Sequence, residues 1–204
     1  MTVLRLHPVI RRAPGQDPSL PSAVRAANQR RGARAVCREC AHTLGHHLRK
    51  LACDGEGHPA PMDGWYWDVS HTGSFVGGVV APFPVGIAVE RVRHHNQEVV
   101  RLYGEREEYE LLGGFRWQTF ARLLSAKLAV LHKAGRKLTE LEDCRLAAVP
   151  SDHGLVLHFQ DRHHFVNQRF LCGHYAAVCA DLPLDAVLEW DWRDFPPQST
   201  SARA

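Results

Sequence analysis

The sequence contains no hydrophobic run long enough to cross a membrane. A spanning helix needs about 20 consecutive apolar residues, and charged residues and prolines interrupt the apolar runs of this 204-residue chain before that length. The first ten residues include Arg5, His7 and Pro8 and do not resemble an export segment. We therefore expect a cytoplasmic protein whose six cysteines are reduced.

An excess of charge of one sign is also missing. The chain has 25 Lys and Arg against 22 Asp and Glu, which gives a net charge of +3 before its 14 histidines are counted. It has no basic run interleaved with aromatic residues, so we expect no nucleic-acid partner. It also has neither a glycine-rich dinucleotide motif nor a P-loop. This charge balance fits an anionic small molecule or an acidic protein partner.

The cysteines and histidines do not form a standard zinc motif. Cys37 and Cys40 precede a group of histidines, but the whole set lies within one helical pattern, and one helix cannot surround a tetrahedral ion. We expect Cys37 and Cys40 to be small buried side chains, with zinc as the alternative. We also expect core positions for two later cysteines and surface positions for two histidine pairs, namely Cys172, Cys179, His94-His95 and His163-His164.

Helical and strand patterns alternate along the chain, as in one α+β domain. Helices are predicted within residues 21–53, 96–112 and 119–134, and strands over residues 2–6, 75–81, 85–89, 145–149, 154–159, 163–166 and 174–180. The last four strands are separated by short turns, which predicts an antiparallel meander. The acidic run at residues 105–110 is interpreted as a solvated face, and residues beyond 195 are expected to be disordered.

Residues 68–91 are the most informative stretch. Pro82-Phe83-Pro84 separates two apolar runs, which we expect to pair as a hairpin. The polar turn Ser70-His71-Thr72-Gly73 enters the first strand and can hold an anion. In the second strand Gly86, Ala88 and Glu90 share one face, because strand side chains alternate.

Two cationic features point to an anionic ligand. Five arginines at roughly helical spacing form either a solvated basic face or a phosphate-binding face, namely Arg25, Arg30, Arg31, Arg34 and Arg38. Lys127 falls inside the apolar stripe of residues 119–134, where an unpaired charge is costly. It either extends to the rim of the core or pairs with an anion, such as Glu90 or a bound phosphate.

Three motifs, in order, resemble those of the 4′-phosphopantetheinyl transferases of the surfactin-synthetase-activating type. Residues 69–73 resemble the family's Ser-His-Ser/Thr-Gly segment, residues 86–90 its G-[IV]-D-[IV]-E strand, and residues 120–135 its F-x-x-x-W-[ST]-x-K-E-[AS]-x-x-K-x-x-G helix. Weaker similarities are Arg34 and Arg38, residues 101–107, and Gly57-His58-Pro59 where the family has Gly-Lys-Pro. Together they cover about residues 30–150.

The resemblance implies an α+β fold of two pseudo-symmetric halves, each with a long helix packed on a small antiparallel sheet. The halves are expected at residues 1–82 and 83–196, followed by a disordered tail at residues 197–204. The family transfers phosphopantetheine from coenzyme A to a serine of an acyl or peptidyl carrier protein in fatty acid, polyketide or nonribosomal peptide pathways. The implied ligand is therefore coenzyme A or another pantetheine-bearing molecule, and the implied partner is a carrier protein or a biosynthetic synthetase.

The resemblance also implies site residues, and the sequence departs from some of them. Phosphate binding falls on Arg34, Arg38, Ser70, His71 and Lys127, and catalytic roles fall on Glu90, Lys127 and His71. The family holds Mg²⁺ with three carboxylates. Here Ala88 and Leu128 replace two of them, so Glu90 alone is left for a metal. His132, where the family has a second lysine, and Glu107 are candidates for the missing base.

Three functions remain open at this point. In the first, the protein binds coenzyme A, a pantetheinylated substrate or a carrier protein, and has lost or changed the transferase reaction. In the second, it is a genuine 4′-phosphopantetheinyl transferase with an atypical metal site. In the third, it is a non-enzymatic interaction module that binds no ligand.

Overall fold

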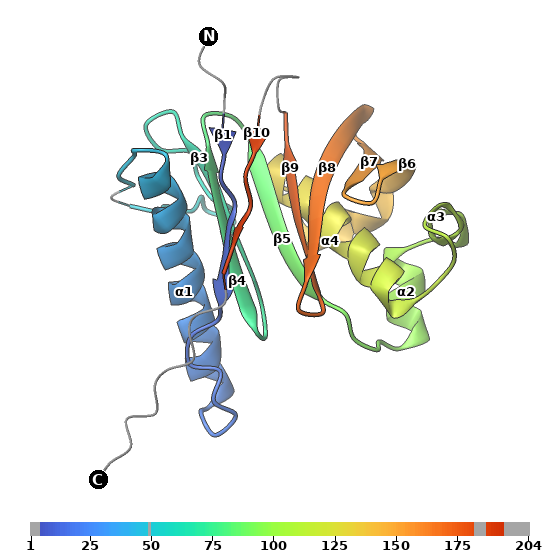
Figure 1. Ribbon diagram of the computed structural model, residues 1–204, viewed down its shortest axis with the longest axis horizontal. Coiled ribbons are helices and arrows are strands. Elements are labelled where there is room, and N and C mark those ends of the chain that lie inside the picture. The colour runs from blue at the N-terminus through green and yellow to red at the C-terminus, as the bar shows by residue number, and fades with distance from the viewer. Residues whose placement is uncertain (1–4, 49, 182–186, 194–204) are drawn as a thin grey trace.

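The computed structural model describes residues 5–48, 50–181 and 187–193, and it has a mixed α+β fold. Two helix-and-sheet units lie side by side, with their sheets facing each other and their long helices outside (Figure 1). Helix α1 (Ser22–Thr43) covers one sheet and helix α4 (Trp117–Ala134) covers the other. Within the described residues, no helix is both long and apolar enough to cross a membrane.

The first unit contains a four-stranded sheet in the order β11-β2-β4-β3. Its strands are β2 (Val9–Arg12), β3 (Tyr66–Thr72), β4 (Phe75–Ala81) and β11 (Asp191–Trp192). A separate pair, β1 (Arg5–Leu6) with β10 (Val187–Leu188), is parallel. The described part of the first predicted strand is therefore confirmed, whereas β2, β3, β10 and β11 were not predicted as strands.

The second unit contains a five-stranded antiparallel sheet in the order β5-β9-β8-β7-β6. Its strands are β5 (Val85–Arg91), β6 (Arg145–Ser151), β7 (Gly154–Phe159), β8 (Arg162–Leu171) and β9 (His174–Ala180). Three short helices precede or follow α4, namely α2 (Gln97–Tyr103), α3 (Arg106–Leu111) and the 3₁₀ helix η1 (Leu138–Asp143). The predicted meander is confirmed.

Helix α4 forms as its sequence predicts. Apolar side chains recur every three or four residues and pack into the core of the second unit, including Phe120, Leu123 and Leu131. Gly135 ends the helix with φ 62°, in the left-handed conformation that suits glycine. Strand β5 lies against this helix at Gly86, where an added Cβ would stand 2.1 Å from the carbonyl oxygen of Ala129. The close approach requires glycine at this position.

The predicted hairpin is wrong. Strands β4 and β5 belong to different sheets, and Pro82-Phe83-Pro84 carries the chain from one sheet to the other. The segment that contains Ser70 and His71 is not a turn, because β3 pairs with β4 through residue 72 and the turn follows at Gly73. The apolar pattern was correct, but it cannot distinguish strands of one hairpin from strands of two facing sheets.

The buried cysteines confirm one sequence prediction and correct another. Cys37 and Cys40 lie in the core between α1 and its sheet, as expected, and the Cys40 thiol donates a 2.8 Å hydrogen bond to the carbonyl of His7. Cys179 is buried in β9. Cys172 is exposed, because it lies in the tight turn between β8 and β9 with φ 52°.

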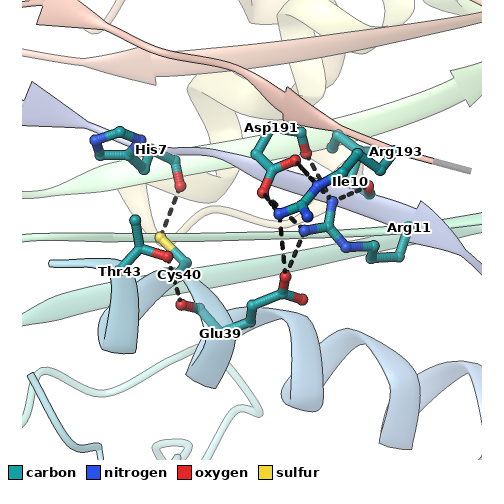
Figure 2. Close-up of polar contacts among 8 residues, drawn as sticks. All are labelled: His7, Ile10, Arg11, Glu39, Cys40, Thr43, Asp191 and Arg193. Atoms are coloured by element: carbon teal, nitrogen blue, oxygen red, sulfur yellow. Dashed lines mark hydrogen bonds and ion pairs between the residues drawn. The ribbon is translucent and has the colours of Figure 1, made fainter.

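A polar cluster fastens the returning strand β11 to the first unit (Figure 2). The Arg11 guanidinium donates to both carboxylate oxygens of Asp191, at 3.2 and 2.8 Å, and also pairs with Glu39 on α1. Arg193 pairs with Asp191 as well. The cluster therefore joins β2, α1 and β11. The predicted disordered tail lies outside the described residues.

Candidate functional site

A cavity of about 300 Å³ opens where α1, β3 and α4 meet. The loop between α1 and β3 contributes its fourth wall. The lining residues are Arg30, Ala33, Arg34, Cys53, Gly57, His58, Pro59, Trp67, Asp68, Val69, His71 and His132. Two arginines and three histidines face one carboxylate in this set, so the cavity is suited to an anion.

The arginines of α1 extend the cationic surface beyond this cavity. Arg30 and Arg34 also line a neighbouring groove of about 390 Å³, together with Arg31 and Arg38. Among the described residues, none of these four guanidinium groups has a carboxylate within ion-pair distance. Unpaired arginines converging on a concave surface are typical of phosphate recognition. Their exposure leaves the alternative of a solvated basic face open.

Asp68 and His132 form a hydrogen-bonded pair at the inner end of the cavity. The Nδ1 atom of His132 lies 3.0 Å from Oδ2 of Asp68 and 2.9 Å from the carbonyl oxygen of Ile87. Both neighbours are acceptors, which places the proton on Nδ1. The backbone N–H of Ile87 donates a 2.7 Å hydrogen bond to the same Asp68 oxygen. Two donors therefore fix the carboxylate, and Nε2 is the ring atom left for a ligand.

This pair exists because of how β5 meets β3. The edge of β5 that faces β3 has no backbone ladder, and side chains of β3 satisfy its N–H groups instead. Asp68 accepts from Ile87, and the Ser70 hydroxyl oxygen accepts a 3.0 Å hydrogen bond from Val89. The polar residues of β3 thus join the two units.

Burial and charge change the titration of the groups around the cavity. Burial lowers the pKa of His132, but the charge of Asp68 and its hydrogen bond outweigh burial and raise the pKa above its usual value. Burial, and then the charge of Arg30, lower the pKa of His71. Burial raises the pKa of Glu90 to about 7, although Arg93 and His132 oppose this. Groups that titrate near neutrality are typical of functional sites.

All but one of the predicted site residues lie at the cavity, at the adjoining groove or where β3 meets β5. Arg34 and His71 line the cavity, and Arg38 lies in the adjoining groove. Ser70 is 8% exposed and is engaged with β5, while Glu90 lies on β5 and interacts electrostatically with His132.

Lys127 lies elsewhere, in the core of the second unit. Its ammonium nitrogen is 2.8 Å from Oε2 of Glu108, and the two side chains are 1% and 5% exposed. The expectation that a buried lysine needs an anion holds, but the anion is this carboxylate rather than Glu90. The interpretation of residues 105–110 as a solvated run is therefore wrong at Glu108, which is buried because it binds Lys127 and the N–H of Leu146.

Sequence reasoning missed Asp68 as a site residue and gave Arg30 no individual role. A signal for Asp68 was present, because a carboxylate between apolar residues in a strand requires a donor. Its donors come from Ile87 and His132, which are 19 and 64 positions away, and no local pattern indicates them.

The carboxylates of this structure do not fit a magnesium site. Within the described residues, no three His, Cys, Asp or Glu side chains are grouped to hold a metal ion. Mg²⁺ prefers a set of ionised oxygen ligands, and Glu90 is the one carboxylate left at the three positions where the resemblance implies metal ligands. At the other two expected positions, Ala88 is fully buried and Leu128 packs against the core.

Comparisons with known proteins identify no family. No protein-family model matches the chain, and a search of curated proteins finds no similar sequence.

Proposed function

We propose that the protein binds coenzyme A or another phosphate-bearing pantetheine ligand in the cavity between α1, β3 and α4. The main support for this proposal is that five cationic or titratable side chains line one cavity, namely Arg30, Arg34, His58, His71 and His132. The protein is a 4′-phosphopantetheinyl transferase-like member of a carrier-protein pathway, with a lost or changed transferase reaction. An acyl or peptidyl carrier protein, or a synthetase, is its partner.

The charges and the dimensions support a ligand with more than one phosphate. A cavity of about 300 Å³ is small for the whole of coenzyme A, but the arginine groove shares two of its lining residues. A diphosphate in the cavity and a further phosphate in the groove would each meet arginines that have no carboxylate partner in the described part of the chain. Arginine forks match phosphate oxygens in pairs.

The arrangement of two similar units supports the same proposal. Each unit packs one long helix on one sheet, and the cavity lies where the units meet, in keeping with the two halves that the resemblance implies. The first sheet differs from the expected antiparallel sheet, because β11, from the predicted C-terminal half, pairs with β2 in parallel. His71 of the Ser-His segment and the early basic helix both reach this cavity. The loss of the carboxylates at Ala88 and Leu128 supports a changed reaction over the family's own.

Calorimetric titration with coenzyme A tests the binding. We expect saturable binding that weakens with salt, and weaker binding of dephospho-coenzyme A and of uncharged pantetheine. Arg34→Ala and His71→Ala should each weaken binding about 10- to 100-fold, since a hydrogen bond to a charged group contributes about 1.5–3 kcal/mol. Arg169→Ala, which removes the same charge from an exposed position on β8, is the matched control. Absence of binding by the unmodified protein would contradict this proposal and favour the alternative of a non-enzymatic interaction module.

Mass spectrometry separates the changed reaction from the family's own. The protein is incubated with an apo carrier protein, coenzyme A and Mg²⁺. A mass gain equal to the pantetheine arm on the carrier protein would establish a genuine transferase and contradict our proposal.

A further inference from the structure

A buried contact between the two units contains two polar atoms without partners. The ring of His174, in β9 of the second unit, makes a T-shaped contact with Phe75 of β4, with 4.8 Å between the ring centroids. Trp192 of β11 lies against the same phenylalanine at 5.7 Å. Among the described residues, Nε2 of His174 and Nε1 of Trp192 are buried and have no hydrogen-bond partner. Native proteins leave few buried polar atoms unpaired, so this contact requires an explanation.

The hydrogen bonds of His174 define its protonation state. Nδ1 lies 2.7 Å from the carbonyl oxygen of Cys172, which can only accept, so Nδ1 carries the proton. In the neutral ring Nε2 is therefore an unpaired acceptor. A second proton would turn Nε2 into a buried donor and place a positive charge on a residue that is 4% exposed. Burying an unpaired charge is far more costly than burying a neutral polar atom.

The surroundings of His174 do not compensate such a charge. Register places three arginines near the contact, on the same faces of neighbouring strands, namely Arg91 of β5, Arg12 of β2 and Arg169 of β8. Asp191 and Arg193 flank Trp192, and because strand side chains alternate they point to the opposite face, where Asp191 pairs with Arg11. Within the described chain, no carboxylate lies at ion-pair distance from His174.

The contact closes one end of the seam, by which we mean the boundary where β3 and β4 of the first unit face β5 and β9 of the second. The β3–β4 turn and the β8–β9 turn lie at the same end of the two facing sheets (Figure 1). Farther along the seam, the Val89 N–H donates to the Ser70 hydroxyl oxygen, and the Ile87 N–H donates to Asp68. Separation of the sheets at Phe75 would reach the Val89 bond first.

We propose that the contact of His174 with Phe75 and Trp192 is an acid-sensitive connection between the two units, which opens when Nε2 takes up a proton. Opening lets water solvate the imidazolium and separates the β8–β9 turn from β4 and β11. Burial lowers the pKa of His174 below its ordinary value of 6.5; the Cys172 hydrogen bond opposes this effect, and the charge of Arg91 adds to it. The inference does not depend on which ligand the cavity binds.

Acid should weaken the fold through His174. The unfolded chain protonates this histidine near pH 6.5, whereas the folded protein resists protonation until a lower pH. Unfolding in this window takes up a proton, so the unfolding equilibrium constant should increase by up to about tenfold for each pH unit below 6.5. Above pH 6.5 both states are neutral at His174, and its contribution should not change.

Urea unfolding between about pH 7 and pH 5 tests the inference. His174→Phe keeps a ring against Phe75 but cannot take up a proton. The other titratable groups are the same in both proteins, so the difference between the two pH profiles isolates His174. Arg91→Gln keeps the histidine and removes a cation that opposes its protonation, so the effect should become smaller. His158→Phe, at an exposed position on β7, is the matched control and should keep the original profile.

Hydrogen exchange of the folded protein detects the opening itself. After correction for the intrinsic exchange rate, protection of the Val89 N–H should fall by up to about tenfold per pH unit in the original protein and stay constant in His174→Phe. The amides of the β7–β8 ladder lie away from the seam and should keep more of their protection.

Each outcome decides the inference. The same pH profile in the original protein and in His174→Phe overturns it. Constant protection of the Val89 N–H over this pH range overturns the opening of the seam, and an undiminished effect in Arg91→Gln contradicts the electrostatic origin. Circular dichroism checks that each variant is folded, and the Arg91→Gln profile and the exchange of the original protein decide the question even if His174→Phe does not fold.

Discussion

Replacing Lys127 with methionine distinguishes a core ion pair from a phosphate ligand. The Lys127 ammonium is 2.8 Å from the Glu108 carboxylate, and both side chains are almost fully buried. Glu108 also accepts hydrogen bonds from the N–H groups of Leu146 at 2.7 Å and Glu105 at 2.9 Å. The pair thus joins α3, α4 and β6. Methionine retains the length and apolar stem of lysine but leaves the carboxylate without its cation.

The expected loss is large for one substitution. Removing one partner of a buried ion pair costs about 3–5 kcal/mol, because a buried charge is left uncompensated. The double variant Lys127→Met with Glu108→Gln removes that charge and keeps an acceptor for one backbone N–H. It should recover about 2 kcal/mol, which leaves roughly the cost of lost hydrogen bonds.

Urea unfolding followed by circular dichroism measures both variants, with linear extrapolation to water. Calorimetry on the folded Lys127→Met protein measures coenzyme A affinity, which we expect to stay within a few-fold of the original. A loss of stability below about 1 kcal/mol would refute the buried-pair reasoning. A stable variant with more than tenfold weaker coenzyme A binding would indicate that Lys127 contributes to phosphate binding, as the resemblance implies.

Three other variants test particular groups. Burial raises the pKa of Glu90 from its ordinary value of 4.5 to about 7 in the folded protein, so this burial should cost stability as pH rises from 4.5 to 7, by at most about 3 kcal/mol. Glu90→Gln should remove this dependence in urea unfolding. Hydrogen bonding from Arg193 is the largest influence that lowers the pKa of Asp191, so Asp191→Asn should cost about 1–3 kcal/mol at neutral pH. The difference should begin to shrink below about pH 4 and should disappear only below the lowered pKa of the folded state. The double variant Ala88→Asp with Leu128→Glu should raise Mg²⁺ affinity in calorimetry, and unchanged Mg²⁺ binding would mean that the alignment with the transferase family is wrong.

The helices and the second sheet could be predicted because their signals are local. Helix α4 has an apolar stripe and ends at Gly135, and each strand of the meander is followed by a short turn. Strands β4 and β5 were recognised as strands, but their pairing was not. All seven residues of β4 and the first five of β5 are buried. Strands covered on both faces indicate a position between packed layers, and a simple hairpin would expose one face.

The candidate site was less predictable because its contacts are distant in sequence. The rule that a buried lysine needs an anion is physical and holds for Lys127. The identity of that anion depended on which turn of α3 faces the core, and the acidic run offered several equivalent candidates. Asp68 presents the same difficulty, since its partners come from β5 and α4.

Two of the departures from the pattern of the transferases that the sequence resembles lie in the cavity, and two lie at the core of the second unit. His58 and His132 stand where the resemblance has lysines, and both line the cavity. Ala88 and Leu128 remove two carboxylates, and Asp68 brings a shielded one against His132. Imidazoles thereby stand where the resemblance has lysines, while Arg30 and Arg34 of α1 supply the cationic wall of the cavity. If phosphate binds in this cavity as proposed, the arginines can hold it directly, and Nε2 of His132 is a ring nitrogen available to the same ligand.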